Sequence, residues 1–173
     1  MIARMIPLMI FALGIGHVVA DELPARKPGL WQITRSPPRP KLPPQVQKIC
    51  LDAATDALLY QLGSAIGRRA CSSLDVHRSG DKVTVSSVCK LGTTVATSHN
   101  VMTWHGAGAY HEDIAVHFNP PLGKTSDSNA SQEAQWLGAC PVDMKPGDIV
   151  TEPSALMPIT MRMNIRDLLK NTK

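Results

Sequence analysis

The feature that most constrains the fold is a long alternation of apolar and polar side chains between residues 71 and 138. A period of two is typical of β-strands that bury one face and expose the other. Clusters of Gly, Asn, Asp, Ser or Pro interrupt the alternation where turns are needed. We therefore expect an antiparallel meander, with strands near residues 73–78, 82–89, 95–104, 109–118 and 131–138.

Two more strands and one helix are expected before the meander. Residues 30–35 follow a Lys-Pro-Gly turn and form the first strand, and residues 45–51 form the second, after a proline-rich connection at residues 37–44. Residues 52–66 form the helix, because Asp52 is a suitable N-cap and Gly67 a suitable stop. The apolar stripe of this helix consists of Ala54, Leu58, Leu59, Leu62 and Ile66.

Together these elements predict an α+β domain, in which a curved antiparallel sheet carries one packed helix and is tied by two disulfides. The core is expected on the face of the sheet that carries Trp104, Tyr110, Ile114, Val116 and Trp136. A curved sheet of this kind can close far enough to hold a small apolar ligand.

The chain has four cysteines, and no two of them form a CxxC pair. An even number without that spacing fits two disulfides in an oxidising compartment better than a zinc site. Three pairings are open. We favour Cys71 with Cys89, which flank a hairpin pattern, and this leaves Cys50 with Cys140.

The register of that hairpin is not settled by the sequence. A two-residue turn at Gly80-Asp81 places Cys89 opposite Ser72. The bridge from Cys71 to Cys89 therefore needs either one β-bulge or a three-residue loop.

Residues 1–20 have the composition of a secretory signal peptide, with Arg4, an apolar run of 12 residues and a small-residue exit at Ala20. Cleavage is expected before Asp21 and gives a periplasmic or secreted protein. The apolar run is shorter than the roughly 20 residues that span a bilayer, so we expect no transmembrane segment. The chain then divides into a leader (1–20), one β-rich domain (21–150) and a basic tail (151–173).

The charge balance excludes two classes of protein. The net charge is +4 and 43% of the residues are hydrophobic, which fits neither a disordered chain nor a nucleic-acid-binding protein. The excess of basic residues lies at the end of the chain, where Arg162, Arg166, Lys170 and Lys173 oppose Asp167.

This basic tail fits two local structures. Residues 157–165 alternate as in a strand, yet residues 161–169 also have an apolar face at helical spacing. We favour a short C-terminal helix, whose basic side is either solvated or in contact with anionic lipid headgroups. The residues that would make this contact are Arg162, Arg166 and Lys170.

Four histidines recur six residues apart, at positions 99, 105, 111 and 117. If Trp104 pairs with Tyr110, these side chains at odd positions lie on the face opposite the aromatics. His99, Asp113 and His117 then lie within plausible reach of a shared zinc or copper ion. The simpler interpretation is that solvent-facing strand positions are polar, and a register shift of one residue would remove the cluster.

The sequence shows no GxSxG, HExxH, P-loop or GxGxxG motif. We therefore assign no catalytic residue and expect no cofactor.

Three segments resemble a known family: KPGLWQIT at residues 27–34, CSSLDVHRSGDKVTVSSVC at 71–89 and WLGACPVDMKPGDIV at 136–150. In their order and spacing they resemble the domain of unknown function 3617 family of exported Gram-negative bacterial proteins. The resemblance implies a periplasmic, disulfide-tied β domain and supplies no catalytic residue. The histidine series and the basic tail do not belong to the pattern that carries it.

The sequence thus predicts a non-catalytic envelope protein that binds a small molecule or another envelope protein, and not nucleic acid. Two alternatives remain at this stage. One is a metal-binding protein that uses the histidine hairpin, and the other is a protein that binds the membrane surface through its basic tail.

Overall fold

A computed structural model describes residues 23–36, 43–154 and 158–170, with the side chains of residues 61–68 left aside. The predicted signal peptide and most of the proline-rich connection lie outside these described residues. No helix in the described part of the chain is long and apolar enough to cross a membrane.

The described residues form nine strands and two helices, in the order β1, β2, α1, β3–β9, α2. The first half comprises β1 (Gly29–Ser36), β2 (Gln45–Leu51), α1 (Ala53–Ala70), β3 (Cys71–Ser79) and β4 (Lys82–Leu91). The second half comprises β5 (Thr94–Trp104), β6 (Ala109–Leu122), β7 (Thr125–Gly138), β8 (Asp148–Thr151), β9 (Met161–Asn164) and α2 (Ile165–Lys170).

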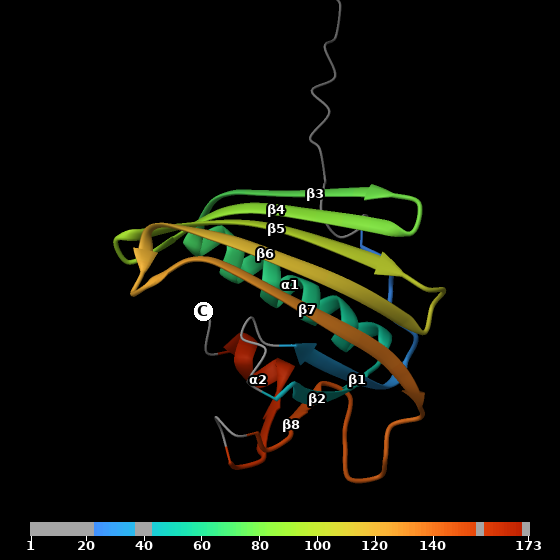
Figure 1. Cartoon of the computed structure of the whole chain (residues 1–173). Coiled ribbons are helices and arrows are strands. Elements are labelled where there is room, and N and C mark those ends of the chain that lie inside the picture. Colours follow the sequence, from blue (N-terminus) through green and yellow to red (C-terminus); the bar gives the residue numbers. More distant parts are fainter. Residues whose placement is uncertain (1–22, 37–42, 155–157, 171–173) are drawn as a thin grey trace, which may run out of the picture.

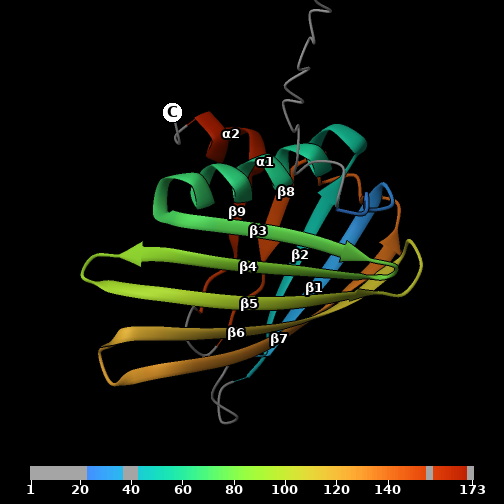
Figure 2. The same ribbon diagram turned by 90° about the horizontal axis from the view of Figure 1, so that it is seen from above.

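All nine strands belong to one antiparallel sheet with the order β3-β4-β5-β6-β7-β1-β2-β8-β9. The sheet curves around α1, and both helices lie on its inner side (Figure 1). Viewed from above, β1 and β2 run obliquely across the direction of β3–β5, so the sheet is strongly twisted (Figure 2). We call the face toward α1 the concave face and the opposite face the convex face. The predicted α+β fold is confirmed.

Helix α1 begins where the sequence predicted and ends four residues later. The Asp52 carboxylate accepts a hydrogen bond from the Thr55 backbone N–H at 2.7 Å, and the Thr55 hydroxyl accepts one from the Asp52 N–H at 2.8 Å. These reciprocal bonds cap the helix and lower the pKa of Asp52. The prediction that Gly67 stops the helix was wrong. A glycine inside a helix costs only about 1 kcal/mol, and α1 continues until the chain enters β3 at Cys71.

The hairpin of β3 and β4 resolves the register question with a bulge. Ser79 pairs with Lys82 and Ser73 with Val88, but Cys71 pairs with Cys89. Ser72 is therefore the extra residue, and the Cys71–Cys89 disulfide forms across the end of the ladder.

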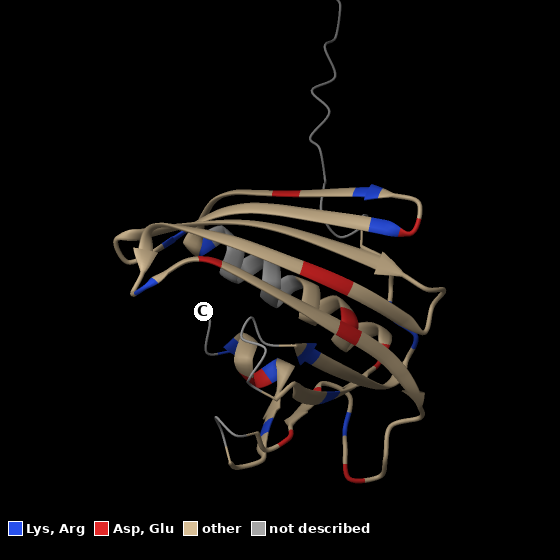
Figure 3. Cartoon of the chain, viewed as in Figure 1, with Lys and Arg blue, Asp and Glu red and all other residues tan. Residues whose placement is uncertain are grey.

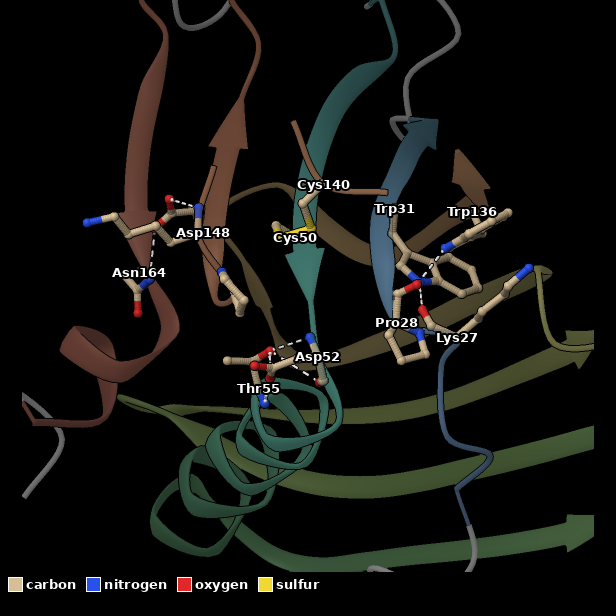
Figure 4. The surroundings of a disulfide bond; sticks show 12 residues. Lys27, Pro28, Trp31, Cys50, Asp52, Thr55, Trp136, Cys140, Asp148 and Asn164 are labelled. Atoms are coloured by element: carbon tan, nitrogen blue, oxygen red, sulfur yellow. Dashed lines mark hydrogen bonds between the residues drawn. A yellow bond between two sulfur atoms is a disulfide. The ribbon is translucent and has the colours of Figure 1, made fainter. Parts of the chain in front are cut away.

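The second disulfide joins Cys50 of β2 to Cys140, which follows β7, with their Cα atoms 5.6 Å apart (Figure 4). Cys50 is fully buried and packs with Met144 and Val150 in a small second core. Both disulfides thus agree with the favoured pairing, and the structure has no free cysteine among its described residues.

Gly29 in the predicted KPGLW segment allows two strands to approach closely. Its φ is +131°, and a Cβ atom there would lie 2.1 Å from the carbonyl oxygen of Gly138. The neighbouring Trp136 donates a hydrogen bond from its ring N–H to the Pro28 carbonyl at 2.9 Å, and Lys27 lies over its ring (Figure 4). Any side chain at position 29 would break this contact.

The structure corrects three boundaries near the end of the chain. Strand β7 begins at Thr125, not at 131, β8 is a strand that the sequence did not predict, and β9 lies within residues 157–165, where a strand was the less favoured of two candidate structures. The tail combines both of its candidate structures, because β9 pairs with β8 and the six-residue helix α2 follows at once. Residues 161–170 therefore continue the sheet and its core.

The core lies on the concave face around three aromatic rings. Trp31, Trp104 and Tyr110 are almost fully buried, and the ring centres of Trp104 and Tyr110 are 4.9 Å apart. The apolar face of α2, including the fully buried Ile165, packs against the same cluster. Of the other predicted core residues, Ile114, Val116 and Trp136 are half-buried.

Candidate functional site

The convex face carries the histidine series in the predicted register. Trp104 pairs with Tyr110 and His99 with Ala115, so the prediction that imidazoles and aromatics lie on opposite faces of the β5–β6 hairpin is correct. His99 and His117 are exposed, and His111 is half-buried.

Each of these histidines has a separate partner. His99 Nδ1 lies 3.2 Å from the Ser86 hydroxyl, and His117 Nδ1 lies 2.8 Å from a carboxylate oxygen of Asp127. Asp113, which the metal hypothesis assigned to His99 and His117, instead contacts His111. Among the described residues, no three His, Cys, Asp or Glu side chains are arranged to hold a metal ion.

The physical reason lies in strand β7. The predicted strand begins at residue 131, which pairs with Asp113, so the prediction gave no partners on this strand to the later part of β6. Because β7 starts at Thr125, Asp127 lies opposite His117. A directly opposite carboxylate is closer to His117 than Asp113, which lies four residues away on the same strand.

His111 has the most distinctive surroundings on the convex face. Its Nδ1 lies 2.5 Å from Glu133 and its Nε2 lies 3.1 Å from Asp113. Two hydrogen bonds raise the pKa of His111 above its ordinary value. The bond with Glu133 has the larger effect and the bond with Asp113 the smaller one. Both carboxylates are well exposed to solvent, so this trio stabilises the fold only weakly.

The tail residues proposed for lipid contact have intramolecular partners. Arg162 pairs with Asp143 at 2.9 Å, Arg166 donates to the carbonyl of Pro146 at 2.6 Å, and Lys170 pairs with Asp167 within α2. The apolar side of α2 is used for packing in the core. An interfacial helix needs an apolar face that is free to enter the membrane.

The concave face holds a buried polar cluster that the sequence did not predict. Glu112 is 8% exposed and lies on β6. One of its oxygens accepts a hydrogen bond from Asn100 of β5 at 3.2 Å, and the other accepts one from the amide of Gln132 on β7. Gln132 is buried too, and its own oxygen accepts a hydrogen bond from Arg35 at 3.1 Å.

Burial dominates the electrostatics of this cluster. Desolvation raises the pKa of Glu112, although the hydrogen bonds from Gln132 and Asn100 act in the opposite direction. In the described part of the chain, Glu112 forms no ion pair. Its carboxylate therefore lacks the direct cationic partner that buried charges usually have.

A second buried charge, Arg26, lies near this cluster but is already paired. Its guanidinium contacts Asp56 of α1 at 2.7 Å, and the two side chains are 8% and 5% exposed. Burial alone would lower the pKa of Arg26, but the rings of Tyr110 and Tyr60 and the Asp56 carboxylate raise it, so the group stays charged. Arg26 lies over both tyrosine rings and joins the segment before β1 to α1 and the sheet.

Three buried polar atoms on the concave side have no hydrogen-bond partner among the described residues. They are the Asn100 side-chain oxygen, the Trp104 ring nitrogen and Arg26 Nε. Such atoms are rare in native structures and often mark a place where another molecule supplies the partner.

A sequence signal for this cluster exists. The alternation that places Tyr110 and Ile114 on the inner face also places Glu112 there, and an acidic residue at an inward position needs an explanation. The pairing of β6 with β7 was required to see that Gln132 lies beside Glu112.

Residues 26–140, well over half of the chain, match the family described as protein of unknown function (DUF3617). The chain belongs to this family. The predicted resemblance is thereby confirmed. The match includes both disulfides, the aromatic core and the Glu112 cluster, and it ends before β8, β9 and α2. No curated protein and no solved structure matches the chain.

Proposed function

We propose that this chain is an exported, non-catalytic protein that binds a small amphipathic molecule on the concave face of its sheet, with the polar group of the ligand at Glu112. Export to the periplasm or beyond is supported by the sequence of residues 1–20 and by two disulfides, which persist in oxidising compartments.

The observation that carries the proposal is the Glu112 cluster. A buried carboxylate held by two amides is costly for stability unless something compensates it. Glu112 and the unpartnered oxygen of Asn100 are both acceptors, so a ligand group that contacts these two is a hydrogen-bond donor. The other two unpartnered atoms, on Trp104 and Arg26, are donors themselves and are not part of this contact. A protonated amine is the strongest candidate, because it supplies both donors and the opposite charge.

The surroundings of Glu112 support an apolar body for the same ligand. Ile114, Val116 and Phe118 follow it at alternate positions of β6, on the same face, and all three are half-buried. Among the described residues, β1 pairs with β7 only from Ser131 onward, so residues 125–130 of β7 have no described strand paired on that side. A ligand can approach the concave face from that side.

Binding is proposed in preference to catalysis because of the groups around Glu112. Asn100 and Gln132 side chains donate and accept hydrogen bonds but do not transfer protons at ordinary pH. They suit the orientation of a ligand.

The test compares dodecylamine, dodecanol and dodecanoate, which share a chain length and differ in the head group. Binding is followed by tryptophan fluorescence and calorimetry on the protein purified from the periplasm. The amine should bind at least tenfold more tightly than the alcohol, and the acid most weakly. Glu112→Gln should remove the preference for the amine, because it removes the charge and keeps the shape.

Glu133→Gln is the matched control, since Glu133 lies on the convex face of the neighbouring strand. It should leave the order of affinities unchanged. The proposal fails if the three head groups bind equally, if none binds, or if the two variants have the same effect. Native mass spectrometry of the same preparation would identify the natural ligand directly.

A further inference from the structure

Two hairpin tips lie together at one end of the sheet, the end at which α1 joins β3 (Figure 1). The β4–β5 tip runs from Leu91 to Thr94 and the β6–β7 tip from Leu122 to Thr125. Each leucine is followed by a glycine in the left-handed region, with φ of +63° and +65°. The two tips therefore have the same local design, Leu-Gly-x-Thr. We call this end the leucine end.

Large apolar side chains are exposed at the leucine end. Leu91 is 44% exposed, Leu122 is 50% exposed, and Val95, beside the first tip, is 40% exposed. These side chains belong to turns or strand ends, where polar residues normally lie. A cluster of exposed apolar residues at protruding tips is typical of a surface that binds a protein or a membrane.

The charged residues of the two tips are basic, and Asp127, two residues beyond the second tip, is paired with His117. Lys90 and Lys124 are the only Asp, Glu, Lys or Arg residues in the segments 89–97 and 118–126. Arg69 lies exposed at the last turn of α1, two residues before Cys71, which is bonded to Cys89. In the part of the chain that the structure describes, none of these three cations forms an ion pair. Figure 3 shows basic residues gathered at this end of the sheet.

The opposite end of the sheet has a different design. Its tips are Ser79-Gly80-Asp81-Lys82 and His105-Gly106-Ala107-Gly108, which contain small, polar or oppositely charged residues. None of the large exposed apolar side chains found in the described residues belongs to these two tips. Among the described hairpin tips, exposed leucines thus occur only at this end, although Leu74 within β3 and Leu137 near the far end of β7 are also exposed.

We propose that the leucine end docks on the surface of an anionic lipid bilayer. Leu91, Leu122 and Val95 enter the boundary between headgroups and acyl chains, and Lys90, Lys124 and Arg69 contact lipid phosphates. The combination of apolar tips with unpaired cations favours a membrane over a protein partner. The centres of protein interfaces are depleted in lysine and enriched in aromatic residues, and neither tip contains an aromatic residue.

This proposal is independent of the ligand site at Glu112, and it replaces the basic tail as the lipid-contacting region. Docking at the leucine end would also place residues 125–130 of β7, the stretch without a paired strand from β1 among the described residues, near the membrane surface, since β7 begins at this end. An amphipathic ligand could then pass between the bilayer and the concave face without crossing water.

The test is co-sedimentation of the protein, purified from the periplasm, with vesicles of equal parts phosphatidylglycerol and phosphatidylcholine, or of phosphatidylcholine alone. The protein should bind the anionic vesicles, and binding should weaken as salt is raised. The double variant Lys90→Gln/Lys124→Gln should bind about 25-fold more weakly, because each basic residue near an anionic surface contributes about fivefold. Leu91→Ser/Leu122→Ser should lose the binding that survives high salt.

The matched control is Arg78→Gln/Lys82→Gln, which removes two exposed cations from the opposite end of the sheet and should change binding less than twofold. Arg166→Gln/Lys170→Gln tests the tail in the same way. Leu91→Trp offers a separate measurement, since its fluorescence should shift to the blue and be quenched by brominated lipid. The proposal fails if the protein binds neither kind of vesicle or binds both equally. It also fails if the tip variants bind as well as the original protein, or if either control variant loses as much binding as they do.

Discussion

The two faces of strand β6 differ sharply although their residues are neighbours in the chain. His111 projects from the convex face and has two exposed carboxylates beside it. Glu112, the next residue, projects from the concave face and is buried with two amides. The pKa of His111 is raised by its hydrogen bonds to two exposed carboxylates, and the pKa of Glu112 is raised by burial.

This difference shows that a cluster of titratable groups is not by itself a site. The histidines drew attention because of their spacing, yet their partners are solvent-exposed, and water screens such pairs. Glu112 belongs to no spacing pattern in the sequence, but its carboxylate is buried, and a buried charge without a cationic partner destabilises the fold. Three pairs of variants test this difference between the two faces.

The largest difference is expected between Tyr110→Ala and His111→Ala. Tyr110 is 2% exposed and contacts Trp31 and Trp104, so its removal should cost about 3–5 kcal/mol of unfolding free energy. Removal of His111 should cost less than about 1 kcal/mol. Urea unfolding followed by tryptophan fluorescence measures both. Similar losses for the two variants would mean that the faces are not distinct in stability.

A smaller difference is expected between Glu112→Leu and Glu133→Leu. The first leaves the side-chain amides of Asn100 and Gln132 buried without an acceptor, which costs about 1–3 kcal/mol for each group. The second alters an exposed position and should change stability by less than about 0.5 kcal/mol. Adding Asn100→Leu to Glu112→Leu should recover part of the loss. If Glu112→Leu leaves the unfolding free energy unchanged, the buried hydrogen-bond network does not stabilise this region.

The smallest effect is the dependence of stability on pH. Both groups have raised pKa values in the folded state, so each stabilises the fold at low pH, and its contribution disappears as pH rises through the raised value. For Glu112 the loss begins above its ordinary pKa of 4.5, and for His111 above 6.5. Glu112→Gln should therefore remove the loss of unfolding free energy that begins above pH 4.5. His111→Gln should remove the smaller loss that begins above pH 6.5. Unfolding free energies measured between about pH 4 and pH 9 separate the two windows. A single variant that removes both parts would show that the faces are coupled.

Much of the fold could be predicted from local pattern. The alternation along residues 71–138 gave the strands, the turn residues gave the hairpins, and the order of cysteines around one hairpin gave both disulfides. The need for a bulge beside Cys71 also followed from counting residues along a two-residue turn. The strands, the hairpins and the Cys71–Cys89 disulfide depend on neighbours within about twenty residues, where geometry leaves few alternatives. The Cys50–Cys140 disulfide spans 90 residues and followed only because these two cysteines were left over.

The remaining strands could not be predicted in the same way. Strands β8 and β9 have only four residues each, and they form because β2 offers β8 a free edge. Helix α2 has an apolar face that fits the core only because the curved sheet encloses it. Long-range pairing thus outweighed local propensity at both places.

The sequence by itself determined which side chains share a face of the sheet, because side chains on a strand alternate whatever the strand pairs with. It also determined the hairpin and the disulfide that ties its end. The tertiary structure decided which strands are neighbours, and hence that His117 pairs with Asp127, that Gln132 lies beside Glu112, and that two leucine tips meet at one end. The physical reason is that the period of a strand is local, whereas its neighbours are selected by burial of the whole sheet around α1.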